Sequence, residues 1–307
     1  MPLVAVLMGG SSAEREISLQ TGEGVRRALE SLGYPVFTLD FDRRFVDEIS
    51  SRSPEVVFNA LHGGAGEDGT VQAILDWLGV PYQGSGVRAS AIAMDKWIAK
   101  SVMRAAALPT PDAIEMPLSG SSLPALPSYP ALPFVVKPRA EGSAVGVTIV
   151  RDGAGWEGAV AAARGVTDRI LVEEYVAGRE FTVAILGDEA LPVIEIKPAD
   201  EFYSYHSKYT AGQSQHIVPA SLAPDKAVQM RESALVLHRA IGARDYSRVD
   251  ILMDARGAVH LLECNTLPGL TRLSLFPDAA AAAGIAYEAL IERLVSAALS
   301  RSGVRAS

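Results

Sequence analysis

Two short segments near the C-terminal end of the chain carry charged and amide side chains at alternate positions. Arg248 and Asp250 lie two residues apart in the first segment, and Glu263 and Asn265 lie two residues apart in the second. The residues at 254–257, Asp-Ala-Arg-Gly, predict a hairpin turn between two strands. Since residues i and i+2 of a strand share a face, we expect the four side chains on one face of a hairpin.

This hairpin would bring Asp250 close to opposite Glu263, and like charges in that position destabilise a sheet. A divalent cation would remove the repulsion, and oxygen ligands without paired His or Cys favour Mg²⁺ or Mn²⁺. The alternative is a solvated strand face. However, the same strands carry apolar residues that indicate burial, namely Ile251, Leu252, Leu261 and Leu262. The pattern therefore favours a metal site.

Residues 137–146 combine a lysine with a polar, glycine-rich loop. Lys137 ends a predicted strand, and Gly142, Ser143 and Gly146 follow it. Backbone N–H groups, a hydroxyl and an ammonium all favour anionic oxygens, so this loop could close over phosphates. An ordinary exposed hairpin loop is an equally good interpretation. The chain has no P-loop motif, and the glycines at 63–66 lack the spacing of a dinucleotide-binding fingerprint.

Two acidic segments have both a functional and a structural interpretation. Glu173-Glu174-Tyr175-Val176 ends a predicted strand, whose edge could offer backbone groups to an adenine ring and a carboxylate to a ribose. A solvated acidic edge is the simpler interpretation. Glu14 opens a helix after the turn at 9–13. It could cap that helix as a first-turn carboxylate, or it could bind the ammonium group of a substrate.

Residues 203–209 are rich in hydroxyl groups and also hold His206 and Lys208. This composition fits either a mobile substrate-binding loop or a polar surface turn. His62 and His206, taken alone, are more often structural than catalytic.

The elements that must position these residues follow from periodicity. In the first third, strands are expected at 3–8, 35–39, 56–61 and from 81, with helices from 11 or 12 to about 32 and at 70–78. This β-α-β alternation predicts a parallel sheet covered by helices. Further along, helices are predicted at 89–107, 224–241 and 286–299, and a surface connection at 117–133. The remaining strands are expected at 134–137, 147–150, 170–175, 180–186, 191–197, 247–253 and 259–265.

Composition narrows the classes of function. The 307 residues carry a net charge of −8 with no long basic run, which disfavours a nucleic-acid partner. Cys264 is the one cysteine, so an intramolecular disulfide is impossible and a reducing compartment is expected. The N-terminus lacks the basic leader of a signal peptide, and no apolar stretch approaches the roughly 20 residues of a membrane span. The sequence therefore predicts a cytoplasmic protein that does not enter a membrane.

Nine segments, in this order over nearly the whole chain, make the sequence resemble the D-alanine–D-alanine ligase family of the ATP-grasp superfamily. They are Gly9-Gly-Ser-Ser-Ala-Glu-Arg-Glu-Ile-Ser-Leu19, Leu61-His-Gly-Gly-Ala-Gly-Glu-Asp-Gly69, Gly84-Ser-Gly86, Met94-Asp-Lys96, Lys137-Pro-Arg-Ala-Glu-Gly-Ser-Ala-Val-Gly146, Glu180-Phe-Thr-Val183, His206-Ser-Lys-Tyr209, Arg248-Val-Asp250 and Glu263-Cys-Asn-Thr-Leu-Pro-Gly269. One departure is Ala144, where many relatives have a second serine.

The resemblance implies an α/β (α+β ATP-grasp) fold in three parts. Residues 1–86 would form an N-terminal α/β domain with a parallel sheet, residues 87–177 a central ATP-grasp lobe, and residues 178–307 a C-terminal ATP-grasp lobe. ATP would lie between the two lobes, with Lys96 and Lys137 on its phosphates. The adenine and ribose would be held by the ATP-binding set Glu173, Glu174, Tyr175, Val176 and Glu180. Two Mg²⁺ (or Mn²⁺) ions would be held by Asp250, Glu263 and Asn265.

The resemblance also implies a two-step reaction. The carboxylate of a first D-alanine would attack the γ-phosphate of ATP, and the amine of a second D-alanine would then attack the acyl phosphate. Arg248 and the amide of Gly269 would stabilise the oxyanion. Glu14 would hold the first ammonium group, and Glu14, Ser143 and Tyr209 would form a hydrogen-bonded set. The other substrate-binding residues would be His62, Lys208, Ser274 and Leu275.

The implied product is a dipeptide for peptidoglycan precursor synthesis, made by a homodimer. Tyr209 favours the dipeptide-forming branch over relatives that form a D-alanyl ester. A nucleotide-binding regulatory module without chemistry is a second alternative, but it would not need the whole set of charged residues. A Rossmann-type dehydrogenase is disfavoured by the absent glycine fingerprint. The segment 117–133 is assigned no function.

Overall fold

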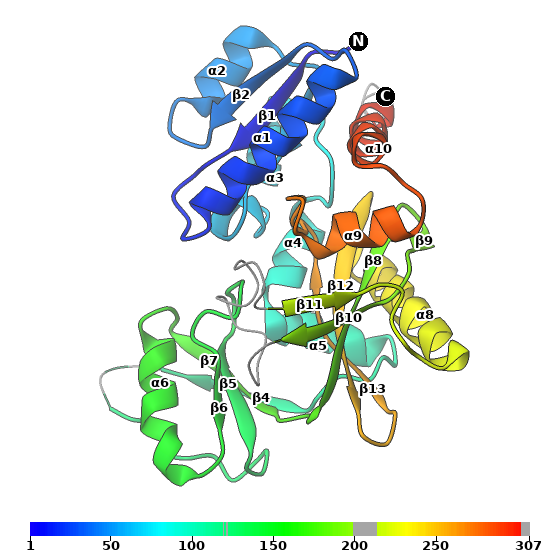
Figure 1. Cartoon of the computed structure of the whole chain (residues 1–307). Coiled ribbons are helices and arrows are strands. Elements are labelled where there is room, and N and C mark those ends of the chain that lie inside the picture. Colours follow the sequence, from blue (N-terminus) through cyan, green and yellow to red (C-terminus); the bar gives the residue numbers. More distant parts are fainter. Residues whose placement is uncertain (119, 121, 199–213, 302–307) are drawn as a thin grey trace.

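The computed structural model describes residues 1–118, 120, 122–198 and 214–301, so the predicted substrate-binding positions Lys208 and Tyr209 lie outside the described residues. Three sheets organise this part of the chain (Figure 1). We call them the N-terminal, central and C-terminal sheets. Residues from all three parts of the chain line the candidate site, although the N-terminal part contributes loop and helix residues rather than strands.

The N-terminal sheet is parallel, as predicted, with strand order β2-β1-β3. Its strands are β1 (Val4–Met8), β2 (Val36–Asp40) and β3 (Val56–Asn59), and its helices are α1 (Arg15–Ser31), α2 (Phe45–Arg52) and α3 (Thr70–Leu78). Strand β1 is a continuous apolar run, and it is buried because β2 and β3 flank it and helices cover both faces of the sheet. The strand predicted from residue 81 is reduced to one bridge, between Tyr82 and Val57.

The central sheet is antiparallel, with strand order β4-β7-β5-β6. Its strands are β4 (Ala113–Pro117), β5 (Phe134–Pro138), β6 (Thr148–Val150) and β7 (Arg169–Glu174). Helix α6 (Trp156–Arg164) packs on this sheet, and Trp156 meets Phe134 edge-on with ring centroids 6.0 Å apart. Among the short elements that the sequence interpretation missed are α2, β4 and α6.

The C-terminal sheet holds the predicted hairpin. It has the order β11-β10-β8-β12-β13, with β9 paired to β8. Its strands are β8 (Gly178–Leu186), β9 (Glu189–Ala190), β10 (Ile194–Pro198), β11 (Ser214–Ile217), β12 (Tyr246–Asp254) and β13 (Val259–Asn265). One face packs against α8 (Pro224–Ile241), and the other packs against α9 (Leu275–Ala282). Helix α10 (Tyr287–Ser300) packs against α9, α1 and β3.

The prediction of a single helix at 89–107 is wrong, because this segment forms two helices, α4 (Val87–Met94) and α5 (Lys96–Ala105). The break is at Asp95, whose backbone is extended and whose carboxylate accepts hydrogen bonds from the N–H groups of Trp97 and Ile98. Arg139 holds the same carboxylate in place with its Nη2 atom 2.6 Å from Oδ2. The cap at Asp95 and its ion pair with Arg139 therefore interrupt the helix, although the helical propensity of the segment is continuous.

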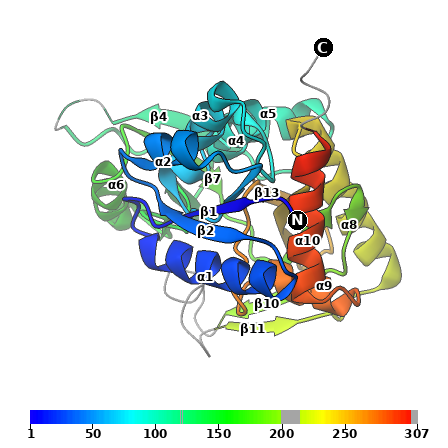
Figure 2. The same ribbon diagram turned by 90° about the horizontal axis from the view of Figure 1, so that it is seen from above.

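The C-terminal helix α10 returns to the N-terminal part of the chain and packs beside α1 (Figure 2). Arg301, just after α10, donates to the carbonyl oxygen of Tyr82 at 2.7 Å and to Asp245 Oδ2 at 2.8 Å. Helices α4 and α5 share a core with α8 and the C-terminal sheet. The domain boundaries at residues 86 and 177 stay a prediction.

Candidate active site

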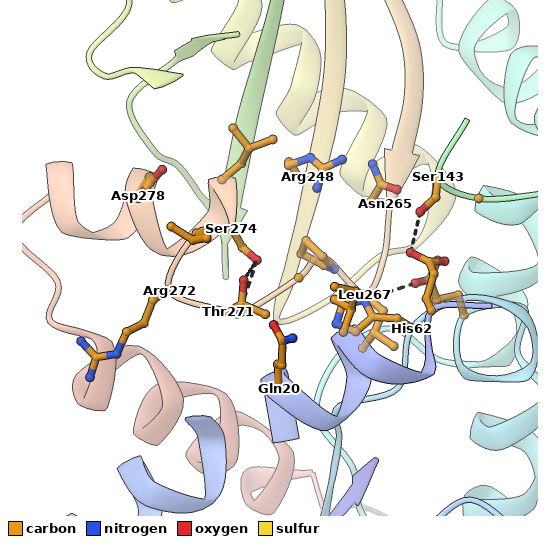
Figure 3. Close-up of a pocket in the computed structure, with 18 of the residues that line it drawn as sticks. Gln20, His62, Ser143, Arg248, Asn265, Leu267, Thr271, Arg272, Ser274 and Asp278 are labelled. Atoms are coloured by element: carbon orange, nitrogen blue, oxygen red, sulfur yellow. Dashed lines mark hydrogen bonds and ion pairs between the residues drawn. The ribbon is translucent and has the colours of Figure 1, made fainter. Parts of the chain in front are cut away.

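Two cavities share the β12–β13 hairpin as a common wall. The larger has a volume of about 300 Å³ and is lined by Glu14, Ile17, Gln20, His62, Glu67, Gly142, Ser143, Ser214, His216, Arg248, Asn265, Leu267, Pro268, Gly269, Thr271, Arg272, Leu273, Ser274, Leu275 and Asp278 (Figure 3). The smaller has a volume of about 150 Å³. Among its lining residues are Lys96, Lys137, Glu173, Glu174, Tyr175, Val176, Glu180, Asp250 and Glu263. The described residues that were predicted as site residues therefore divide between two adjoining spaces.

The hairpin places Asp250 opposite Glu263, as expected, and Arg248 opposite Asn265. Arg248 forms a bidentate ion pair with Asp250, with its Nε atom 2.8 Å from Oδ1 and its Nη2 atom 2.7 Å from Oδ2. Thr182 on β8 and Asn265 also donate to Asp250, at 2.6 Å and 3.2 Å. The carboxylate is thus buried but fully engaged, as a buried charge must be.

The cations of the smaller cavity are paired with carboxylates of the same cavity. The Nζ atom of Lys96 lies 3.3 Å from Glu263 Oε2 and donates to the carbonyl oxygen of Glu141 at 2.6 Å. Lys137 forms an ion pair with Glu173. An incoming anion that carries its own cation could replace the partners in these pairs: the anion would bind the lysines, and the cation would bind the carboxylates. No buried charge would then be left unpaired.

Glu14 lies at the N-cap position of α1, but its side chain makes no cap hydrogen bond, so the capping interpretation is wrong. Instead Ser143 Oγ donates to Glu14 Oε1 at 2.5 Å, which joins the N-terminal turn to the loop after β5. A Cβ atom at Gly63 would come within 2.7 Å of the same carboxylate, so only glycine leaves room for it. The predicted contact between Glu14 and Ser143 is therefore present.

His62 is buried beside this carboxylate, and its Nε2 atom lies 2.9 Å from Thr21 Oγ1. Burial lowers the pKa of His62 to about 4, although Glu14 raises it and Arg248 adds to the lowering. Burial and then the charge of Glu14 raise the pKa of Glu67 to about 7. The sequence interpretation missed Glu67, which stands in the quoted segment at 61–69 but has no distinctive spacing.

Glu67→Gln should stabilise the protein increasingly as the pH rises. The carboxyl group is protonated in the folded state up to about pH 7 but titrates near 4.5 when unfolded, so its ionisation weakens the fold across this window. The variant should gain about 2 kcal/mol in free energy of unfolding between about pH 5 and pH 8, relative to the wild type. Urea unfolding of both proteins measures this gain. A pH-independent difference would contradict it.

His62 has the opposite effect on the pH dependence, because a lowered histidine pKa makes stability rise with pH from about 4 to 6.5. His62 Nδ1 lies 3.9 Å from Glu67 Oε1, so the substitution also changes the surroundings of the imidazole. The comparison between wild type and Glu67→Gln isolates the carboxyl group above about pH 6.5, where His62 is neutral in both the folded and the unfolded protein.

At the far end of the larger cavity, Ser274 precedes α9 and accepts a hydrogen bond from the N–H of Thr271 at 3.1 Å. A Cβ atom at Gly269 would lie 2.9 Å from Ser274 Oγ and 3.4 Å from His62 Cε1. The backbone of Gly269 therefore approaches both residues closely. Figure 3 also shows four lining residues that sequence reasoning missed, namely Gln20, Arg272, Thr271 and Asp278.

The residues on the hairpin fit a hard divalent cation. Asp250 and Glu263 are opposed carboxylates, each paired with a cationic side chain that a metal could replace. The third oxygen would come from the amide of Asn265, whose nitrogen already donates to Asp250. Within the described ranges, no group of three or more His, Cys, Asp and Glu side chains is arranged as a metal site.

Solved structures with the same overall arrangement define the class of fold. The D-alanine–D-alanine ligase of Bacillus anthracis, solved in complex with ATP, matches with a TM-score of 0.86 and 30% sequence identity, covering 99% of both chains. A second structure of that ligase matches with a TM-score of 0.85. The protein therefore has the ATP-grasp fold, preceded by a parallel α/β domain.

Sequence comparison then defines the family. Residues 44–85 match the family described as D-ala D-ala ligase N-terminus, and residues 120–296 match D-ala D-ala ligase C-terminus. D-alanine–D-alanine ligase B of Chromobacterium violaceum is 45% identical, with 94% of each chain covered. The D-alanine–D-alanine ligase of a Synechococcus species is 44% identical, with 99% of this chain and 95% of the relative covered. The chain belongs to the D-alanine–D-alanine ligase family.

Proposed function

We propose that this protein is a D-alanine–D-alanine ligase, which joins two molecules of D-alanine and converts ATP to ADP and phosphate. The observation that carries the proposal is the shared β12–β13 wall. Arg248 and Asn265 line the larger cavity, and Asp250 and Glu263, two residues away along their strands, line the smaller one. A phosphate transferred from a nucleotide in the smaller cavity would therefore meet a carboxylate held in the larger.

The smaller cavity is the proposed nucleotide site. Lys96 and Lys137 would exchange their carboxylate partners for phosphate oxygens, and Glu173, Glu174, Tyr175, Val176 and Glu180 would surround the adenosine. Asp250, Glu263 and Asn265 would hold two Mg²⁺ or Mn²⁺ ions. Bound metal neutralises phosphate charge, which is the largest requirement of phosphoryl transfer.

The larger cavity is the proposed site for both D-alanine molecules. Glu14 would bind the first ammonium group beside His62, which stays neutral because burial lowers its pKa to about 4. The carboxylate of this molecule would attack the γ-phosphate and become an acyl phosphate. The amine of the second D-alanine would then attack the acyl carbon. Ser274 and Leu275, at the start of α9, would receive the second carboxylate.

Arg248 and the N–H of Gly269 would stabilise the negative oxygen formed by that attack, and phosphate would then leave. Tyr209 would complete a hydrogen-bonded set with Glu14 and Ser143, and Lys208 would contact the substrate. A closed site would protect the acyl phosphate from water. The contact between Glu14 and Ser143 supports this arrangement, because it already links the two loops that flank the site.

The proposed product serves peptidoglycan precursor synthesis, and therefore cell-wall formation and cell shape. We further propose a cytoplasmic homodimer. In the part of the chain that the structure describes, no helix combines the length and apolar character that a membrane crossing requires.

Phosphate release from Mg²⁺–ATP by the purified protein tests the proposal. D-alanine should stimulate release and L-alanine should not, and the dipeptide should appear in equal amount to phosphate. Stimulation by D-alanine only together with a D-hydroxy acid would instead indicate an ester-forming ligase. ATP binding without any release in the presence of D-alanine would reject the proposed substrate.

A further inference from the structure

A fully enclosed lysine lies behind the wall of the smaller cavity. Lys100 on α5 exposes 1% of its side chain and does not line either cavity. Its ammonium group donates to Thr110 Oγ1 at 2.7 Å and to the carbonyl oxygen of Pro111 at 2.9 Å, and it forms an ion pair with Glu173. An ammonium has three hydrogens to donate, so these acceptors satisfy the buried charge.

Glu173 is shared by two lysines on opposite sides. Its Oε1 atom pairs with Lys137, which lines the smaller cavity, and its Oε2 atom pairs with Lys100 in the protein interior. Glu173 is itself 2% exposed, and its partner Lys100 lies outside the cavity lining, so the Lys100 side of the carboxylate is closed to water. The three residues come from α5, β5 and β7, and they hold the helix, the strand and the cavity wall in one charged cluster.

Both Glu173 and Lys100 are charged at neutral pH. Burial raises the pKa of Glu173, but Lys137 and Lys100 outweigh burial and leave the pKa below its ordinary value. Burial lowers the pKa of Lys100 to about 8, with Glu173 raising it and the nearby Lys137 and Arg104 lowering it. The cluster therefore contains one carboxylate and two lysines, so Glu173 has one more cationic partner than it needs to balance its charge.

We propose that Lys100 is a positioning residue for ATP: it remains the permanent partner of Glu173 when Lys137 turns from that carboxylate to the nucleotide phosphates. The inference rests on the proposed function only in taking ATP as the ligand of the smaller cavity. Removing one partner of a buried ion pair is costly because the other charge is left unpaired. Because Lys100 stays paired with Glu173, the carboxylate keeps a counter-ion when Lys137 moves to the phosphates. The binding free energy of the nucleotide is then not reduced by the cost of an unpaired buried charge.

Calorimetric titration with ATP, without D-alanine, tests this on the wild type, Lys100→Met, Glu173→Gln and the double variant. Lys100→Met should weaken ATP binding about tenfold, because Lys137 would then leave Glu173 without a counter-ion. In the Glu173→Gln background the same substitution should change the affinity less than about twofold, since no charge remains to be balanced. In steady state, the KM for ATP should rise in the single variant while the KM for D-alanine stays unchanged.

Two controls separate positioning from general destabilisation. Lys100→Arg keeps the charge and should recover most of the affinity for ATP, whereas Lys226→Met, on α8 and outside both cavities, should leave it unchanged. Equal losses with and without Glu173, or an unchanged affinity in Lys100→Met, would overturn the proposal. If Lys100→Met does not fold, Thr110→Val removes one acceptor of the ammonium. It should weaken ATP binding about threefold, and no loss would overturn the proposal as well.

The outcomes also separate this inference from the proposed function. A wild-type protein that binds ATP but ignores D-alanine would reject the proposed substrate and leave the test of Lys100 valid. A wild-type protein that binds no ATP would overturn both.

Discussion

Arg248→Ala should lower kcat by about 10²–10³ while the protein remains folded. In the proposed reaction the guanidinium of Arg248 faces the oxygen that becomes negative when the second D-alanine attacks. The same group fixes Asp250 through two hydrogen bonds, at 2.8 Å and 2.7 Å. Its loss therefore removes a charge that stabilises the transition state and loosens a proposed metal ligand. Rates of phosphate release at saturating ATP, D-alanine and Mg²⁺ measure the effect.

The fold should survive this substitution because Asp250 keeps two other donors. Thr182 Oγ1 lies 2.6 Å from Oδ1, and the amide nitrogen of Asn265 lies 3.2 Å from Oδ2. Arg256→Ala is a matched control, since Arg256 lies in the turn of the same hairpin with 88% of its side chain exposed. The control should keep the wild-type rate. A wild-type rate in Arg248→Ala would exclude the oxyanion role.

Glu263→Gln should raise the Mg²⁺ concentration needed for half-maximal activity by at least about tenfold. A carboxylate is a strong ligand for a hard dication and an amide is a weak one. Glu263 also forms an ion pair with Lys96, at 3.3 Å, so the substitution frees that lysine from its acidic partner. Activity should therefore be recovered in part at high Mg²⁺, where metal binding is again saturated. Titration of the rate with Mg²⁺ at fixed ATP gives the midpoint.

The recovery at high Mg²⁺ distinguishes a lost ligand from a damaged fold. Glu232→Gln, on an exposed position of α8, makes the same chemical change away from the site and should leave the midpoint unchanged. If the midpoint of Glu263→Gln equals that of the wild type, Glu263 is not a metal ligand.

Both predictions depend on a common property of the site, which is that its charges are paired before any ligand arrives. Arg248 pairs with Asp250, Lys96 with Glu263, and Lys137 with Glu173. A metal–nucleotide complex carries both signs of charge, so it can take over both members of such pairs. We therefore expect a single substitution to have two effects: it weakens ligand binding, and it leaves the other residue of the ion pair without its counter-charge.

The sequence alone determined the local parts of this protein. Strict alternation placed Arg248 and Asp250 on one face of their strand, and Glu263 and Asn265 on one face of theirs. The predicted turn brought Asp250 close to Glu263, whereas the exact register includes an irregularity between Asp250 and Ile251 that the sequence did not indicate. The buried run of β1 and the alternation of strands and helices likewise indicated the parallel N-terminal sheet. These features could be predicted because side-chain periodicity and turn chemistry act over a few residues.

Only the tertiary structure decided which distant residues meet. Ser143 donates to Glu14 across 129 positions of the chain, and Lys100 reaches Glu173 from another element. The same is true of the break at Asp95, where Arg139 on a different segment overrides helix propensity. Neither the partners of a buried charge nor its pKa can be deduced from spacing, because both depend on which surfaces pack together and exclude water. Sequence thus set the chemistry available along each strand, and packing set which charges share a cavity.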